Sequence, residues 1–279
     1  MNRLLVMDRK RSTRRLGARI AALVWLAAAS AGPTPAASGQ SDLPKGADVI
    51  DGWLAASGGA AYDAIRNRVS KSTVEVLGAN IRGTVTMHEA RPNLVYVVSV
   101  LSQTGKIEEG TNGRVAWKID AARGARVKTD AEGAQALRNA DFERFVKWRK
   151  TFQRAECVAS AEVAKKKCFK VVMTPPQGEI EIWYIEKETK RLVKREYTHK
   201  RQRGDLIISE YYSDYRKLDG ILLAYKARQI IRPKTAQPAR TQVLLITIDS
   251  IEHNVDLPKD RFDIPPAIQA LLKESKQAP

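Results

Sequence analysis

The chain contains residues that could do chemistry, but their spacing matches no catalytic or metal-binding pattern. Glu179 and Glu181 alternate along one predicted strand. An acid and a base need different environments, and one strand face gives both carboxylates the same one. The three histidines, His88, His199 and His253, are isolated among strand residues, and HExxH, GxSxG and glycine-rich phosphate loops are missing from the sequence. The sequence therefore predicts no catalytic residue, metal or cofactor, and a protein that is not an enzyme.

The two cysteines, Cys157 and Cys168, are the remaining reactive side chains. In an oxidising compartment such a pair predicts a disulfide, whereas in the cytosol it predicts two thiols. Both lie on a predicted hairpin, and a two-residue turn at Lys165-Lys166 would pair Cys168 with Val163, not with Cys157. The bridge then needs a bulge or a wider loop, because Cα atoms more than about 7 Å apart cannot be joined. We expect the disulfide, with two buried thiols as the alternative.

Residues 1–31 have the three parts of a secretory signal. Residues 1–19 carry seven Arg or Lys against one Asp, an apolar run follows over residues 20–32, and small residues stand at Ala29 and Ala31. The run is shorter than the roughly 20 residues that span a bilayer. We expect cleavage near Ala31, with Ser38 as a second choice and an uncleaved anchor as the alternative. Residues 32–44 are small, polar and proline-rich, which predicts a flexible leader.

The charge of the chain is strongly positive. Of the formal +17, residues 1–31 contribute +6, which leaves +11 for the remaining chain. A basic surface favours anionic partners such as a membrane surface, although it is also an ordinary way to keep a protein soluble. No finger, homeodomain or RNP-type motif accompanies the charge, so nucleic acid is not an expected partner.

The elements that must position any site are mostly strands. Residues 45–66 have a helical pattern interrupted at Gly58-Gly59, residues 130–152 are a second helix candidate with Asp130 as N-cap, and residues 265–275 form a closing helix. Between them we count roughly twelve strands without alternating helices, which predicts an antiparallel sheet. Residues 45–279 are expected to form a single domain.

Several predicted strands are apolar on both faces. The segment "IRGTVTMHE" alternates apolar and polar residues, but "LVYVVSVL" at residues 94–101 and "VLLITI" at residues 243–248 do not. A strand that is apolar on both phases is covered on both faces, or one face lines an apolar cavity. Periodicity alone leaves a packed core and a cavity as alternatives.

Four stretches resemble the superfamily of the periplasmic lipoprotein carrier LolA. They are "VIDGWLAASGGAAYDAIRNRVSKSTVEV", "IEEGTNGRVAWKID", "YYSDYRKLDGILLAYKARQ" and "VDLPKDRFDIP", which together span about residues 47–265. The resemblance implies a mainly β fold: an incomplete antiparallel β-barrel, LolA/LolB-like, with helices covering the concave face. It also implies a periplasmic location and a role in outer membrane biogenesis.

The resemblance further implies a binding or carrier protein for an acylated or apolar cargo, a lipid or a lipoprotein, held in a hydrophobic cavity. The residues predicted to line the cavity or its lid are Trp53, Leu54, Val85, Met87, Tyr96, Val98, Trp117, Phe142, Phe145 and Trp148. Ordinary core packing is the alternative for each of them.

A second hypothesis comes from a different class of function. Related folds also serve as envelope-stress or regulatory modules, so the basic surface could bind a membrane protein partner or an anionic membrane surface. In either case we expect a monomer.

Overall fold

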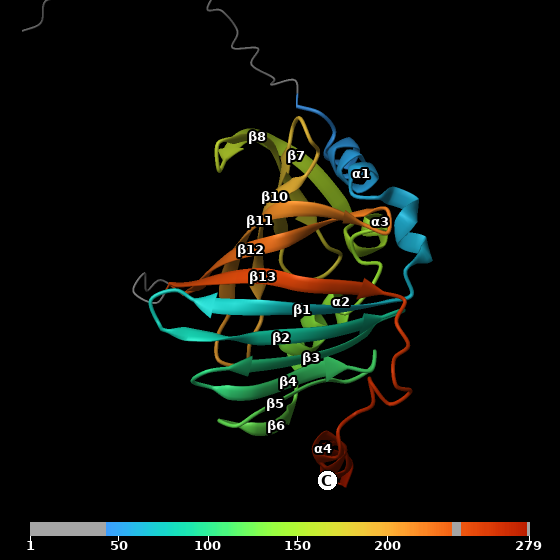
Figure 1. Ribbon diagram of the computed structural model, residues 1–279, viewed down its shortest axis with the longest axis vertical. Helices are drawn as coiled ribbons and strands as arrows, with labels where there is room; N and C mark the ends of the chain where they lie inside the picture. Colours follow the sequence, from blue (N-terminus) through green and yellow to red (C-terminus); the bar gives the residue numbers. More distant parts are fainter. Residues whose placement is uncertain (1–42, 236–240, 278–279) are drawn as a thin grey trace, which may run out of the picture. The chain divides into compact units, whose positions relative to one another are not determined.

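The described residues form one open antiparallel sheet. A computed structural model describes residues 43–235 and 241–277, and these residues form 13 strands in the order β6-β5-β4-β3-β2-β1-β13-β12-β11-β10-β9-β8-β7 (Figure 1). The strands are β1 (Asn67–Val76), β2 (Ile81–Ala90), β3 (Leu94–Leu101), β4 (Gly105–Thr111), β5 (Ala116–Asp120), β6 (Gly124–Val127), β7 (Arg154–Val163), β8 (Lys166–Thr174), β9 (Glu181–Glu186), β10 (Leu192–His199), β11 (Leu206–Leu218), β12 (Ile221–Pro233) and β13 (Gln242–His253). The predicted signal peptide, residues 1–31, lies outside the described residues.

The sheet consists of two runs of hairpins joined by one long-range pair. β1 to β6 follow one another, as do β7 to β13, and β1 pairs with β13. The outer strands β6 and β7 are not neighbours, so the sheet does not close. The predicted incomplete β-barrel is thus confirmed. Residues 128–153 must run from one edge of the sheet to the other, and they contain the helices α2 (Asp130–Asn139) and α3 (Trp148–Thr151).

The helices agree with the predicted pattern except in one segment. α1 (Gly46–Ala56) and the 3₁₀ helix η1 (Gly59–Ala64) are separated at Gly58, which has a φ of +128°, and α4 (Pro266–Gln277) ends the described chain. The single helix predicted over residues 130–152 is wrong, because α2 stops at Asn139 and Thr129, not Asp130, occupies its N-cap position. Tertiary contacts override the helical pattern there, since the Phe142 amide donates a hydrogen bond to the Pro92 carbonyl at 3.0 Å.

The predicted disulfide is not formed in the structure, where Cys157 and Cys168 are both free thiols. The β7–β8 register pairs Cys168 with Ala161 and Cys157 with Val171. The two cysteines therefore lie about four residues apart along the hairpin. At about 3.3 Å per residue that separation is well beyond the roughly 7 Å that a disulfide spans.

The sheet face under α1 and α3 is filled by a solid core. The Trp183 ring has three edge-on aromatic neighbours, with centroid distances of 5.1 Å to Trp53, 5.3 Å to Phe145 and 5.8 Å to Phe152. Met173 on β8 and Ile185 on β9 are fully buried in the same cluster. This part of the interior is therefore occupied by the chain's own side chains. No helix in residues 43–235 and 241–277 has the length and apolar character needed to cross a bilayer.

Candidate ligand-binding cavity under helix α2

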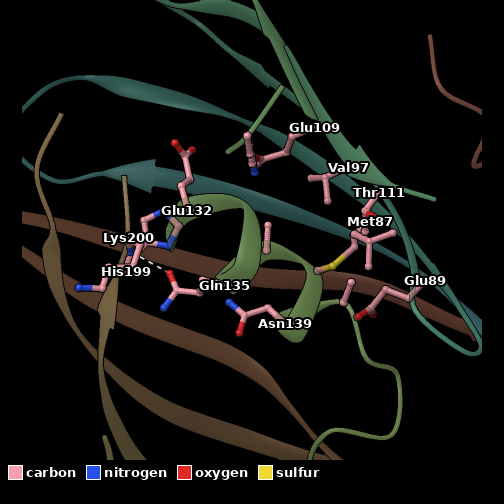
Figure 2. A pocket seen from close by; sticks show the side chains of 15 residues that line it. Met87, Glu89, Val97, Glu109, Thr111, Glu132, Gln135, Asn139, His199 and Lys200 are labelled. Carbon is pink, nitrogen blue, oxygen red and sulfur yellow. Dashed lines mark hydrogen bonds and ion pairs between the residues drawn. The ribbon is translucent and has the colours of Figure 1, made fainter. Parts of the chain in front are cut away.

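A cavity of about 230 Å³ lies between α2 and strands β2 to β4 (Figure 2). Its apolar wall consists of Met87, Val95, Val97, Gly110, Ala136 and Ala140. Its polar wall consists of Glu89, Glu109, Thr111, Lys128, Glu132, Gln135, Asn139, His199 and Lys200. An apolar cavity of about 150 Å³ admits a benzene ring, so this volume has room for a short apolar segment of a ligand.

Strand curvature brings these residues together. In the sheet, β4 and β10 are seven strands apart, which would be about 34 Å on a flat surface at roughly 4.8 Å per strand. Glu109 on β4 and His199 on β10 nevertheless line the same cavity. The sheet must therefore bend around the cavity, which lies on its concave side.

Cross-strand register explains the apolar floor. Met87 pairs with Val97, and Val97 pairs with Glu109. Directly paired side chains of an antiparallel sheet point to the same face, so these residues form one row across β2, β3 and β4. Val95 belongs to the next row. The concave face of this region is therefore apolar at β2 and β3 and becomes charged at β4.

Helix α2 closes the cavity through a small number of polar contacts. The Gln135 Nε2 donates to the Thr198 carbonyl at 2.7 Å, and the Lys200 amide donates to the Gln135 Oε1 at 2.7 Å. The Arg126 guanidinium donates to both Glu132 oxygens, at 2.7 and 3.0 Å. These contacts attach the start and the middle of the helix to β6 and β10 respectively.

Small residues on the inner face of α2 leave the space open. Ala136 and Ala140 are four residues apart, which places them on the same side of the helix axis, and both line the cavity. Gly133 lets the helix approach the preceding backbone closely, because a β-carbon there would lie 2.4 Å from the Lys128 carbonyl oxygen. Larger residues at Ala136 or Ala140 would occupy the volume that a ligand needs.

The charged groups in the cavity wall compensate one another. Burial would raise the pKa of Glu109, but the Lys128 ammonium at 2.7 Å outweighs it, and the net pKa is lowered. Burial also raises the pKa of Glu132, but the Arg126 guanidinium lowers it, and the net pKa is lowered. For His199, burial lowers the pKa and the positive charge of Lys128 lowers it further. At neutral pH the carboxylates are thus ionised and paired, and the imidazole is neutral.

The alternating carboxylates Glu179 and Glu181 have different partners. Glu179 pairs with Lys200 at 2.9 Å and with Lys234 at 2.6 Å, whereas Glu181 is buried and forms an ion pair with Arg144. The two glutamates therefore have separate cationic partners. Within the described residues, no group of three or more His, Cys, Asp or Glu side chains is arranged to hold a metal ion.

Of the residues predicted to contact cargo, Met87 lines the cavity, and Val85 lies two residues along the same face of β2. Tyr96 and Val98 alternate with the lining residues Val95 and Val97 and so point to the opposite face. There, Arg261 of the C-terminal segment lies 5.6 Å from the Tyr96 ring centroid.

Trp117 is nearly fully buried on that opposite face, with its ring centroid 6.0 Å from the Tyr96 ring centroid. On this outer face, residues 258–265 of the C-terminal segment border a hollow beside Tyr96, and α4 contacts β6, which pairs with the strand that carries Trp117. The double apolar phase of β3 therefore has two causes: one face lines a cavity and the other packs under the C-terminal segment.

The remaining predicted residues come from α1 and the α2–α3 segment. Trp53, Leu54, Phe145 and Trp148 belong to the solid core around Trp183. Phe142 packs beneath two guanidinium groups, with Arg68 and Arg91 at 5.9 and 5.4 Å from its ring centroid. None of these five aromatic and aliphatic side chains lines the α2 cavity.

Sequence reasoning missed most of the cavity wall. The prediction chose the face of β3 that carries Tyr96 and Val98, whereas the cavity is lined by the other face, with Val95 and Val97. Both faces of this strand are apolar, so the strand pattern does not show which face is concave. Gln135 and His199 carry no motif. Ala136 and Ala140 have helical spacing, but Ala131, Gly133 and Ala134 are equally small, so the sequence does not single out the helix face that borders the cavity.

Comparisons with known proteins identify the fold. No protein-family model and no curated protein matches the sequence. A DUF1329 family protein from Desulfovibrio piger is 13% identical, with 78% of this chain and 97% of that chain covered at a TM-score of 0.51. A putative outer membrane lipoprotein-sorting protein domain from Vibrio parahaemolyticus is 11% identical, with 82% and 98% covered at 0.50. For a LolA superfamily protein from Nitrosomonas europaea the values are 10% identity, 79% and 98% coverage, and 0.49. At such low identity a likeness shows architecture alone, and the chain has a LolA-like fold.

Proposed function

We propose that this chain is a periplasmic binding or carrier protein that holds an acylated or apolar cargo in the α2 cavity. The observation that carries the proposal is the apolar space between α2 and β2–β4, in a sheet whose other half is filled by its own side chains. The similarity in fold to a lipoprotein-sorting domain supports the same class of cargo. The pattern of residues 1–31 supports export.

The size of the cavity and the attachment of α2 support a cargo that enters under a mobile lid. Each buried CH₂ group gains about 0.8 kcal/mol, so a partly enclosed acyl chain already binds with useful affinity. The cavity of about 230 Å³ is limited in size, so an acyl chain longer than it can enclose needs α2 to move outward. The helix has ten residues and is attached mainly by polar contacts, which is typical of elements that open at low free-energy cost.

An uncharged ligand tests the proposal directly. Calorimetric titration with decanol should give saturable binding to the wild-type chain. Ala136→Phe, which fills the cavity from its α2 wall, should weaken decanol binding by about tenfold or more, because the aliphatic contacts are lost. Ala134→Phe is the matched control: Ala134 lies on the exposed side of the same helix and should leave binding unchanged.

Two results would contradict the proposal. If wild-type protein binds neither decanol nor a charged decyl ligand, the cavity is not a cargo site. If Ala136→Phe and Ala134→Phe bind decanol equally well, the ligand lies elsewhere. Circular dichroism of both variants should match that of the wild type, so that a folding defect is not mistaken for a loss of binding.

A further inference from the structure

A second cavity of about 310 Å³ adjoins the first. The two share four lining residues, Glu109, Lys128, Glu132 and His199, so they are separated by side chains and not by a layer of backbone. The second cavity lies over β4, β5 and the β5–β6 turn on one side, and over the loop that follows β10 on the other. Its position continues the α2 cavity toward the β6 edge of the sheet.

The second cavity differs from the first in its charge. Six cationic side chains line it: Lys118, Arg123, Arg126, Lys128, Arg201 and Arg203. It has three carboxylates, Glu109, Asp120 and Glu132. The cavity is therefore strongly basic, whereas its neighbour combines an apolar wall with three glutamates and two lysines.

The three carboxylates offset only three of the six positive charges, and each of them already has a hydrogen-bonding partner. Glu109 accepts from Lys128 at 2.7 Å, and Glu132 is held in the bidentate contact with Arg126. Asp120 accepts the backbone amides of the β5–β6 turn, including that of Arg123 at 2.9 Å. All three acids thus serve the local structure.

Within the described part of the chain, four cations of this cavity form no ion pair, although Lys118 is the cross-strand neighbour of Glu109 and helps to lower the pKa of that carboxyl group. Across the described ranges, no carboxylate lies within ion-pair distance of Lys118, Arg123, Arg201 or Arg203. Arg123, Arg201 and Arg203 are exposed, and they reach the cavity from two segments, the β5–β6 turn and the loop after β10. Guanidinium groups that converge from two sides are suited to the oxygens of a carboxylate or a phosphate.

We infer that the two cavities form one site for an anionic amphiphile. The alkyl chain occupies the α2 cavity, and the carboxylate or phosphate headgroup lies in the basic cavity among Lys118, Arg123, Arg201 and Arg203. This inference rests on the proposed function, because it names the chemical class of the cargo and the direction in which it lies. His199 and the Lys128–Glu109 pair mark the boundary between the alkyl part and the headgroup.

The test compares ligands that share one alkyl chain. Decanol, decanoate and decyl phosphate are titrated into the full chain, and inorganic phosphate is titrated alone. Decyl phosphate should bind about tenfold more tightly than decanol, because charge-assisted hydrogen bonds are among the stronger polar contacts. Inorganic phosphate should bind far more weakly than decyl phosphate, since it lacks the apolar part.

Variants assign the preference to the basic cavity. The double variant Arg123→Gln/Arg203→Gln should bring the decyl phosphate affinity to within about twofold of the decanol affinity measured on the same variant, because the headgroup loses two guanidinium partners. Arg82→Gln/Arg154→Gln removes the same charge at exposed residues that line neither cavity, and should keep the preference.

Three other results of these titrations would each contradict a specific part of the inference. Equal affinity of the wild type for decanol and decyl phosphate overturns the headgroup site but leaves the apolar cargo site intact. Inorganic phosphate binding as tightly as decyl phosphate means that the basic cavity holds a free anion and not an amphiphile. An equal loss of preference in both double variants means that the effect is one of net charge, and that the basic cavity does not recognise the headgroup.

Discussion

His199 is the titratable residue that best reports on the interior at this boundary. The groups that act on it are Lys128 and Arg201, which disfavour its protonation, and Glu109 and Glu132, which favour it. Burial outweighs each of them, and the net pKa is lowered. Because the unfolded chain has the higher pKa, about 6.5, it binds the proton more readily as the pH falls. Stability linked to His199 is therefore present above that pH and is lost below it.

His199→Gln should make the melting temperature less dependent on pH between 7.5 and 5.5. His88 contributes separately, because burial and then Arg261 lower its pKa as well, so the double variant His88→Gln/His199→Gln should have the smallest dependence. Thermal unfolding followed by circular dichroism measures this. Identical pH dependence in wild type and His199→Gln would mean that the imidazole is solvated and does not lie in the cavity wall.

The individual cavity residues were the least predictable part of the protein. Val95 and Tyr96 are adjacent and both suit a strand, yet one lines the cavity and the other packs under the C-terminal segment. Their side chains point to opposite faces of the sheet, and the curvature of the sheet makes one of these faces concave. That curvature arises from many strands together, so neither residue reveals it locally. Met87 was predictable because its strand alternates cleanly, which left one apolar face to choose.

At the scale of elements, the proposed function makes α2 the lid that cargo must pass. Gln135→Ala removes both hydrogen bonds that attach the middle of the helix to the end of β10. Each bond contributes about 0.5–1.5 kcal/mol, so the lid should open several-fold more often. Amides of residues 133–140 should exchange with solvent faster, and the dissociation rate of decanol should rise by a similar factor.

The control for that variant is Gln269→Ala in α4. This variant also truncates a glutamine, and the Gln269 side-chain amide donates a hydrogen bond to the Ile264 carbonyl in the same C-terminal segment. Gln269 does not line the cavity. Exchange in α2 and decanol dissociation should both stay at wild-type values. If Gln135→Ala also leaves them unchanged, α2 does not act as the lid, and cargo enters by another route.

The elements themselves were largely predictable. The turn at Asp219-Gly220 between β11 and β12 has φ values of +48° and +81°, which is the geometry that a short polar pair with glycine favours in a hairpin. The structure of segment 130–152 was not predictable, because its helical pattern competes with aromatic ring contacts that exist only in the folded chain. Arg68 and Arg91 position Phe142 from β1 and the end of β2, and no local rule anticipates partners so far away in sequence.

At the scale of the whole molecule, the two faces of the curved sheet have different roles. The C-terminal segment covers the outer face, where Ile268 of α4 is fully buried. Ile268→Ala should reduce the free energy of unfolding by about 2–5 kcal/mol, because it leaves a void against neighbouring side chains. Urea unfolding measures this change, and the exposed neighbour Gln269→Ala should alter stability by less than about 0.5 kcal/mol.

The same variant separates stability from binding. Under conditions in which it remains folded, Ile268→Ala should bind decanol with wild-type affinity, because α4 does not line the α2 cavity. A parallel loss of decanol affinity would mean that the outer cover and the inner cavity are coupled through the sheet. In that case the two faces could not be treated as independent.

The sequence by itself determined the strands, the helix break at Gly58, the open antiparallel architecture and the resemblance that implied an interior for apolar cargo. These follow from local periodicity, turn residues and the order of short motifs, all of which act over a few residues. Only the tertiary structure decided which half of the interior is solid around Trp183 and which half is hollow under α2. The physical reason is that packing depends on the volumes of side chains from strands distant in sequence. Large rings from α1, α3 and β9 meet in one half, and alanines face valines in the other.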